Sequence, residues 1–251
     1  MPQILVPVDL STNSKNAYAY ALGLAKRLQL DVKLLHVYNR SFVPNEPMQF
    51  DGDNSLEESD ERRLKQFAQP HPLDPDYLRL QVPPNVNVTY DTVINLSAAA
   101  GIRAAATEED VEMIVMGTSN KTGIFVNWLG STASTISETA SKPVMLIPPT
   151  VTFADYRTII VANHYETTDN DVLEQVSTLG KLFDATLHFA HIISPTDHFP
   201  YQFVARSISE RLTTDSDQEI AFKVANLKSD SVAEGLEQYA EKQDAHTPPP
   251  P

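Results

Sequence analysis

Apolar residues follow two different periods along the first 150 positions of the chain. Short runs rich in β-branched residues, such as "QILVPVD" at residues 3–9, are typical of strands that are buried on both faces. Between these runs, apolar residues recur every three or four positions, which is the period of an amphipathic helix. The pattern predicts strands at residues 3–9, 31–38, 85–93, 111–117 and 142–149, and helices at residues 11–30, 54–69, 96–109 and 130–141.

The alternation of strands and helices defines the fold class. Each strand–helix–strand unit is expected to cross over in the right-handed sense and to place its two strands parallel in one sheet. Five strands alternating with four helices therefore predict an α/β fold, a doubly wound open sheet of five parallel strands. We predict that this sheet and its helices form a first domain at residues 1–150.

The opening pattern starts again near residue 157, which indicates an internal repeat. The repeat runs at a constant offset of 155 positions through its second strand. Farther along, Gly101 aligns with Gly235 at an offset of 134, so the second copy is 155 − 134 = 21 residues shorter there. It ends where the first copy begins its fourth strand, and we predict a partial second domain with a proline-rich tail at residues 151–251. Pairs at the offset of 155 include Leu5 and Ile160, Leu24 and Leu179, and His36 and His191.

The charge and the cysteine content exclude several kinds of partner and chemistry. The chain has 33 acidic and 19 basic residues, a net charge of −14, which repels nucleic acids and anionic membranes. Because it has no cysteine, it forms no disulfide and offers no thiolate to a metal or a substrate. No apolar window approaches a membrane span, and Pro7 and Asp9 interrupt the first apolar run too early for a signal peptide. We expect a soluble cytoplasmic protein that binds neither nucleic acid nor membrane.

One loop has the composition of a phosphate site. The segment "VMGTSNKTGIFVNWLGST", residues 115–132, follows the fourth predicted strand and leads into a helix. A helix N-terminus at the end of a parallel strand offers unpaired N–H groups and a positive dipole end to a phosphate. A purely structural loop, in which Ser131 caps the helix, explains the sequence "GST" but not the length of the loop. We therefore favour phosphate binding over the structural alternative.

Three segments resemble the universal stress protein family: "ILVPVDLS" at residues 4–11, "LLHV" at residues 34–37, and residues 115–149. The resemblance covers the predicted first domain, and it implies a Rossmann-like nucleotide-binding fold. The internal repeat implies a tandem arrangement of such domains, in which residues 155–246 are a degenerate partial copy.

The loop is similar to the pattern of nucleotide-binding members, which is Gly-x-x-Gly, nine residues, and then Gly followed by Ser or Thr. Gly117 matches the first glycine, and Gly130 with Ser131 matches the last pair across a spacer of the same length. Asn120 stands at the second glycine, and asparagine is the non-glycine residue that most readily takes the left-handed conformation. The resemblance implies that the first domain binds ATP or a related adenine nucleotide, together with Mg²⁺.

The expected binding residues divide into a base site and a phosphate site. Asp9 lies at the carboxyl edge of the first strand, where its carboxylate would accept hydrogen bonds from ribose or adenine; the alternative is that it caps the first helix. The second copy has His164 at the matching position, so we expect no binding there. The apolar adenine slot comprises Pro7, Val8, Val37 and Met116, which are also ordinary core residues. The phosphate site comprises Gly117, Asn120, Lys121, Gly130, Ser131 and Thr132, although a lone loop lysine is more often only solvated.

Neither a catalytic residue nor a metal site is predicted. The sequence lacks the phosphate-loop, dinucleotide and nucleophile-elbow motifs, has no general base beside the loop, and has no cluster of histidine and carboxylate residues with metal spacing. Regulation by a bound nucleotide is the leading function, a nucleotide-free dimerisation module is the alternative, and weak ATP hydrolysis is a third. The apolar strand at residues 143–148 is expected at a sheet edge, where it predicts a homodimer.

Overall fold

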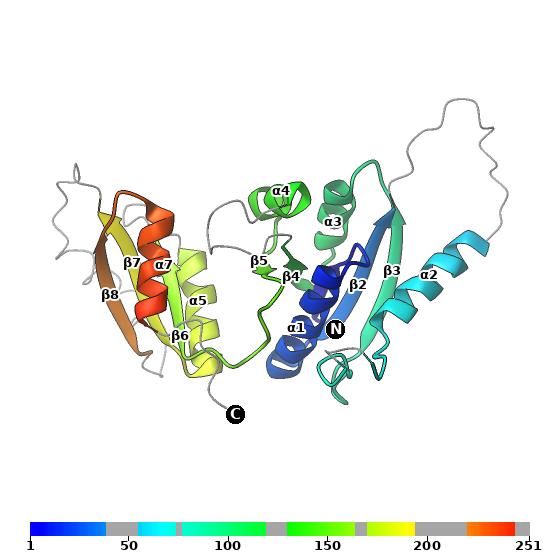
Figure 1. The fold of residues 1–251 in the computed structure, drawn as a ribbon, viewed down its shortest axis with the longest axis horizontal. Helices are drawn as coiled ribbons and strands as arrows, with labels where there is room; N and C mark the ends of the chain where they lie inside the picture. Colours follow the sequence, from blue (N-terminus) through cyan, green and yellow to red (C-terminus); the bar gives the residue numbers. More distant parts are fainter. Residues whose placement is uncertain (39–54, 74–76, 119–129, 164–169, 194–219, 244–251) are drawn as a thin grey trace. The chain divides into compact units, whose positions relative to one another are not determined.

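The computed structural model resolves two compact units along the chain, one that ends at Phe153 and one that begins at Ala154 (Figure 1). The residues that it describes are 1–38, 55–73, 77–118, 130–163, 170–193 and 220–243. Among these residues, no helix combines the length and the apolar character needed to cross a membrane.

Five parallel strands form the sheet of the first unit, in the order β3-β2-β1-β4-β5. The central strand β1 is buried at every position, as its uninterrupted apolar run predicts. The predicted fold class is therefore confirmed. The strands are β1 (Gln3–Pro7), β2 (Asp31–Tyr38), β3 (Val88–Ile94), β4 (Val111–Gly117) and β5 (Val144–Ile147).

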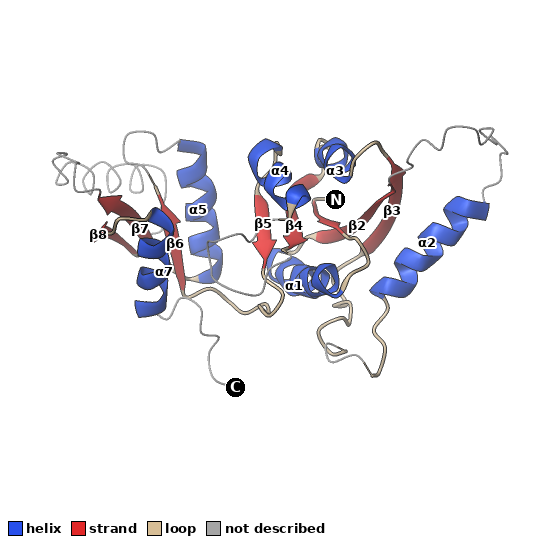
Figure 2. Cartoon of the chain, turned by 45° about the horizontal axis from the view of Figure 1, so that its top comes forward, coloured by secondary structure: helices blue, strands red, loops and turns tan. Residues whose placement is uncertain are grey.

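Helices cover both faces of this sheet. Helices α1 and α2 lie on one face, and α3 and α4 lie side by side on the other (Figure 2). The core beneath α3 and α4 contains Leu5, Leu35 and Ile114 from the sheet and Ile102 and Ile136 from the helices. The helices are α1 (Thr12–Leu28), α2 (Ser55–Ala68), α3 (Ala98–Ala106) and α4 (Ser131–Thr139).

The strand order creates a switch point between β1 and β4. From β1 the chain moves outward through β2 to β3, and it then returns to the other side of β1 to form β4 and β5. Open α/β sheets bind their ligands outside the carboxyl ends of the strands at such a point. The fold therefore predicts a ligand site at the carboxyl ends of β1, β2 and β4.

The chain that leaves β5 packs against α1 within the first unit. The side-chain amide of Asn16 donates hydrogen bonds to the carbonyls of Pro148 and Val151, at 3.0 and 3.1 Å. Farther along α1, the ring of Phe153 contacts the ring of Tyr20 edge to face. These contacts fix the course of residues 148–153 along the helix.

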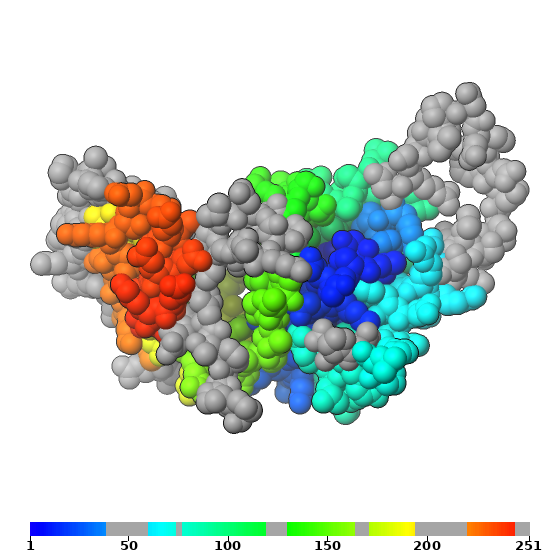
Figure 3. All heavy atoms as spheres, in the orientation of Figure 1, coloured from blue at the N-terminus to red at the C-terminus, as the bar shows by residue number. Residues whose placement is uncertain are grey.

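The second unit contains a smaller parallel sheet in the order β6-β7-β8. Its core includes Val161, Leu173, Leu187 and Phe189. Helix α7 forms part of the outer surface of this unit, in red in Figure 3. The elements are β6 (Thr158–Ala162), α5 (Asn170–Phe183), β7 (Thr186–Ile193), β8 (Phe222–Lys228) and α7 (Val232–Lys242).

The two units share strand bounds and register at the offsets found in the sequence. Adding 155 to the bounds of β1 and β2 gives the bounds of β6 and β7, and adding 134 to those of β3 gives β8. The pair Gln3 and Asp31 becomes Thr158 and Thr186 at the same offset. The described strands of the second unit therefore repeat the first three strands of the first.

A histidine side chain makes the same hydrogen bond in both units. Nδ1 of His36 lies 2.6 Å from the carbonyl oxygen of Val8, and Nδ1 of His191 lies 3.1 Å from that of Asn163. Because a carbonyl only accepts, Nδ1 is the protonated nitrogen in each ring. The bond ties together the carboxyl ends of the first two strands of each sheet, so it belongs to the fold shared by the two units.

Candidate functional site

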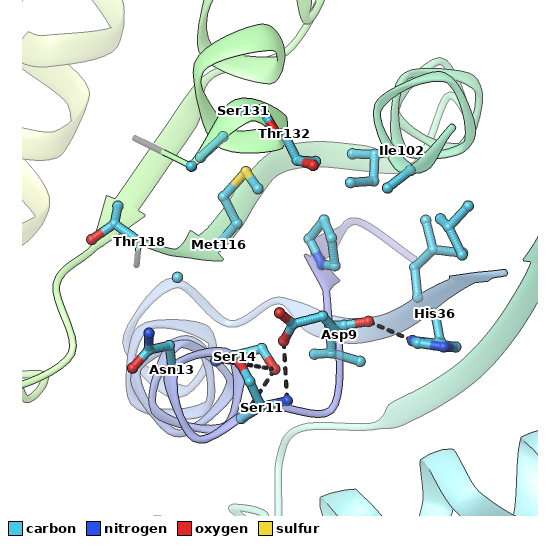
Figure 4. A pocket seen from close by; sticks show the side chains of 18 residues that line it. Asp9, Ser11, Asn13, Ser14, His36, Ile102, Met116, Thr118, Ser131 and Thr132 are labelled. Atoms are coloured by element: carbon cyan, nitrogen blue, oxygen red, sulfur yellow. Dashed lines mark hydrogen bonds between the residues drawn. The ribbon is translucent and has the colours of Figure 1, made fainter. Parts of the chain in front are cut away.

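A cavity of about 260 Å³ lies at the carboxyl ends of β1, β2 and β4 (Figure 4). Its volume is near the lower end of the roughly 300 to 1,000 Å³ that small-molecule sites occupy. The first turns of α1, α3 and α4 also line it, through residues that include Asn13, Ala98 and Ser131. Three helix N-termini, each the positive end of a helix dipole, thus face one cavity.

Most of the residues expected to bind a ligand lie around this cavity. Asn120 and Lys121 lie outside the described residues, so the structure does not place them. The expected residues that line the cavity are Pro7, Val8, Asp9, Val37, Met116, Gly117, Gly130, Ser131 and Thr132.

One side of the cavity is apolar. The side chains of Val8, Ile102 and Met116 are buried and line it together with Val37. Helix α3 approaches the sheet closely here, because a Cβ built on Gly101 would lie only 2.7 Å from a methyl carbon of Val37. The wall is therefore formed by closely packed apolar side chains.

Asp9 brings a negative charge to the start of α1. The N-cap of the helix is Ser11, whose hydroxyl accepts the N–H of Ser14, so Asp9 lies outside the cap position. Oδ1 of Asp9 accepts the N–H of Ser11 at 3.0 Å. Loss of hydration raises the pKa of Asp9, but hydrogen bonds from Ser11 and Ser14 outweigh it and lower the pKa below its usual value. The carboxylate is ionised at neutral pH and acts as an acceptor.

Among the described residues, no side chain caps the N-terminus of α4, which lines the cavity. Its N-cap is Gly130, and its first turn contains no acidic residue. The structural alternative, in which Ser131 caps the helix, is therefore not observed. Gly130 has φ −56°, a conformation that any residue can adopt, so glycine is not required here for its backbone freedom. Because it has no side chain, it does not itself cover the first N–H groups of α4.

Gly117 and Thr118 close the cavity at the end of β4. A Cβ on Gly117 would lie 2.7 Å from the carbonyl oxygen of Asn13, so the absence of a side chain lets β4 approach the first turn of α1. Thr118 is 1% exposed, and its Oγ1 has no hydrogen-bond partner among the described residues. A buried hydroxyl without a partner costs free energy, which a polar ligand atom could recover.

The sequence did not identify nine other residues that line the cavity. Asn13 and Ser14 were hidden in the first turn of a helix, although the spacing of Ser11 and Ser14 is a capping signal. Thr118 follows Gly117 directly, but nothing in the sequence shows its burial. Among the described lining residues, Asp9 is the carboxylate and no lysine or arginine occurs. The nine residues are Ser11, Asn13, Ser14, Leu35, His36, Ala98, Ile102, Thr118 and Ala133.

The doubly wound parallel sheet makes this an α/β protein, with a cavity at the switch point where proteins of this architecture commonly bind ligands. The model of the universal stress protein family matches residues 1–148. This match spans more than half of the chain, so the chain belongs to the universal stress protein family. No curated protein sequence matches the chain.

Solved structures are similar in fold. A universal stress protein from Archaeoglobus fulgidus DSM 4304 aligns with a TM-score of 0.68 and 20% identity, over 97% of this chain and 84% of its own. A functionally unknown protein from Pseudomonas aeruginosa PAO1 aligns with a TM-score of 0.57 and 17% identity, over 98% and 79%. A universal stress protein in complex with cAMP aligns over 59% of this chain and 98% of its own, with a TM-score of 0.41 and 13% identity.

Proposed function

We propose that the first unit binds ATP or a related adenine nucleotide in this cavity and that the protein acts as a regulatory stress protein. The observation that carries the proposal is the N-terminus of α4, which no described side chain caps and which faces the same cavity as an apolar wall and an ionised carboxylate. An apolar wall suits a base, a carboxylate suits hydroxyl donors, and a helix N-terminus suits a phosphate. These three groups occur together in a nucleotide.

The parts of a nucleotide are assigned to the cavity as follows. Adenine would lie against Pro7, Val8, Val37 and Met116, and Asp9 would accept from ribose or from the base. The phosphates would lie at Gly117, Gly130, Ser131 and Thr132, with Asn120 and Lys121 contributing from the loop. Mg²⁺ would accompany the phosphates and offset their charge, because the described lining residues include no basic side chain.

Titration calorimetry with Mg-ATP, up to millimolar concentration, tests this proposal. We expect saturable heat with the wild type and affinity about ten-fold lower in Gly130→Val, whose side chain would cover the first N–H groups of α4. Thr139→Val, at the other end of the same helix, is the control and should bind as the wild type does.

Two outcomes bear on the alternatives. The absence of heat and of a thermal shift with the wild type would refute nucleotide binding and favour a nucleotide-free interaction module. That alternative has one observation behind it, since the packing of Gly117 on Asn13 accounts for this glycine without a ligand. Equal affinities of Gly130→Val and the wild type would place the nucleotide elsewhere. We assign no residue to hydrolysis.

The second unit is proposed to be a partial universal stress protein domain that binds no nucleotide. Its described strands repeat β1, β2 and β3, but among its described residues no element corresponds to β4 or α4. Those two elements carry Gly117 and Gly130 in the first unit. At the place of the apolar Val8 the second unit has Asn163, which changes the chemistry of the equivalent slot.

We propose a homodimer through residues 143–148, whose strand β5 lies at the edge of its sheet as the sequence predicts. The strand has four apolar residues and no charge that would block pairing with another chain. Light scattering should give about twice the chain mass of 27.8 kDa. Met145→Lys, which puts a charge on this edge, should give the monomer mass, and a monomeric wild type would contradict the proposal.

A further inference from the structure

The outer edge of β6 differs from the equivalent edge of β1. Strand β1 pairs with β2 on one side and with β4 on the other. Strand β6 occupies the position of β1 in the second sheet and pairs with β7. In the part of the chain that the structure describes, no strand pairs with β6 on its other side.

Burial of the two strands shows the effect of this difference. Ile4 and Leu5 of β1 are both fully buried, at 0% exposure. Their equivalents, 155 positions later, are Ile159 and Ile160 of β6, which are partly exposed. The side chains of Ile159 and Ile160 point to opposite faces of the sheet. Covering both of them requires a group that reaches both faces, as an added strand does.

Backbone hydrogen-bonding groups of β6 also point to the side away from β7. The N–H of Asn163 donates to the carbonyl of Ala190 in β7, and the direction alternates along a strand. Thr158, Ile160 and Ala162 therefore direct their backbone groups away from β7. In β1, the residue equivalent to Thr158 is Gln3, whose N–H donates to the carbonyl of Asp110 at the start of β4.

The composition of β6 does not protect its edge. Proteins commonly place charged side chains on edge strands to prevent pairing with other chains. The edge strand β3 contains Asp91, and the edge strand β8 contains Lys223 and Lys228. Strand β6 has the sequence "TIIVA" and contains no charged residue and no proline. The edge is therefore chemically suited to accept another strand.

We propose that the edge of β6 binds an extended apolar segment of a partner protein, which adds to the sheet as a parallel strand in the place that β4 takes beside β1. Such a segment would present large apolar residues opposite Ile159 and Ile160, as Met113 and Ile114 of β4 do opposite Ile4 and Leu5. Backbone hydrogen bonds would supply affinity, and the alternating side chains would supply specificity.

A partner segment fits the edge better than a second copy of β6 does. Two copies of β6 related by a two-fold axis would run antiparallel. The strand that fills this position in the first unit is parallel.

A fluorescent peptide with the sequence of residues 110–118 is the probe, because it contains the strand that fills this position in the first unit. We expect saturable binding of the peptide to the full chain, measured by fluorescence anisotropy. Ile160→Pro removes an outward N–H and should weaken binding about ten-fold. Ala162→Pro is the matched control. The equivalent residue of β1 is Pro7, and the pairing of β1 with β4 extends only to Leu5, so this variant should bind normally.

Folding of each variant is verified by circular dichroism and thermal unfolding. If Ile160→Pro does not fold, Thr158→Pro replaces it, because proline is tolerated at the first residue of a strand and still removes an outward N–H. The proposal is overturned if the wild type does not bind the peptide, or if the folded edge variant and Ala162→Pro bind it equally. Self-association of the wild type that the edge variant abolishes would identify a second copy as the occupant and would also overturn it.

Discussion

Replacing Gly117 with alanine is expected to destabilise the first unit by about 2 kcal/mol and to abolish nucleotide binding. The added Cβ would lie 2.7 Å from the carbonyl oxygen of Asn13 and 3.0 Å from its carbonyl carbon. These are backbone atoms, which cannot rotate away, so β4 and the first turn of α1 must move apart. Asn13 and Ser14 line the cavity from that turn, and the movement would therefore change the site as well as the packing.

Gly180→Ala, in helix α5 of the second unit, is the control for this substitution. Its Cβ would lie 3.0 Å from a terminal methyl carbon of Leu187, which a small side-chain adjustment relieves, and alanine favours the helix by about 1 kcal/mol over glycine. Chemical denaturation should show little change in the unfolding free energy of Gly180→Ala, and calorimetry should show unchanged nucleotide affinity. A Gly117→Ala protein with the stability and affinity of the wild type would show that the close approach of β4 to α1 is not required.

Replacing Asn16 with alanine is expected to destabilise the first unit by about 3 kcal/mol. Asn16 is 5% exposed, and its amide nitrogen donates to the carbonyls of Pro148 and Val151. Its Oδ1 accepts a hydrogen bond of 2.8 Å from Arg79. Alanine would leave the two carbonyls without this donor and would remove the connection between α1 and the segment that follows β5.

The control for Asn16 is Thr12→Ala at the exposed start of the same helix. Chemical denaturation should place its unfolding free energy within about 0.5 kcal/mol of the wild type. Limited proteolysis should also cleave residues 148–153 faster in Asn16→Ala than in Thr12→Ala. Equal stabilities and equal cleavage rates in the two variants would mean that the Asn16 hydrogen bonds contribute little.

The fold could be predicted well from the sequence because each strand of the first unit is a local run of apolar residues. Strand β1 is buried at every position, so its apolar run has no polar interruption. The offsets of 155 and 134 also transferred the strand bounds of the first unit to the second without adjustment. Periodicity and internal repetition can both be read from the sequence alone, without knowledge of the tertiary structure.

The cavity was predictable only in part, because half of its lining depends on distant contacts. The strand ends and the glycine pair lie in recognisable motifs, and the structure brings Asp9, Met116 and Gly130 together. The hydrogen bond from His36 to Val8 joins residues 28 positions apart, and no local sequence pattern predicts it. The unpaired hydroxyl of Thr118 likewise follows from its burial, which the sequence does not show.

The second copy is shorter than the first between its second and third strands, so this segment of the fold tolerates a change in length. Between Tyr38 and Val88 the first unit has 49 residues, and between Ile193 and Phe222 the second has 28, yet the adjoining strands keep the same pairing. Since loop length is a weak determinant of stability, this crossover is the natural point for inserting a reporter domain or an affinity tag. A tag at that point would mark the protein in cells while leaving the chain termini and the apolar edge strands β5 and β6 untouched.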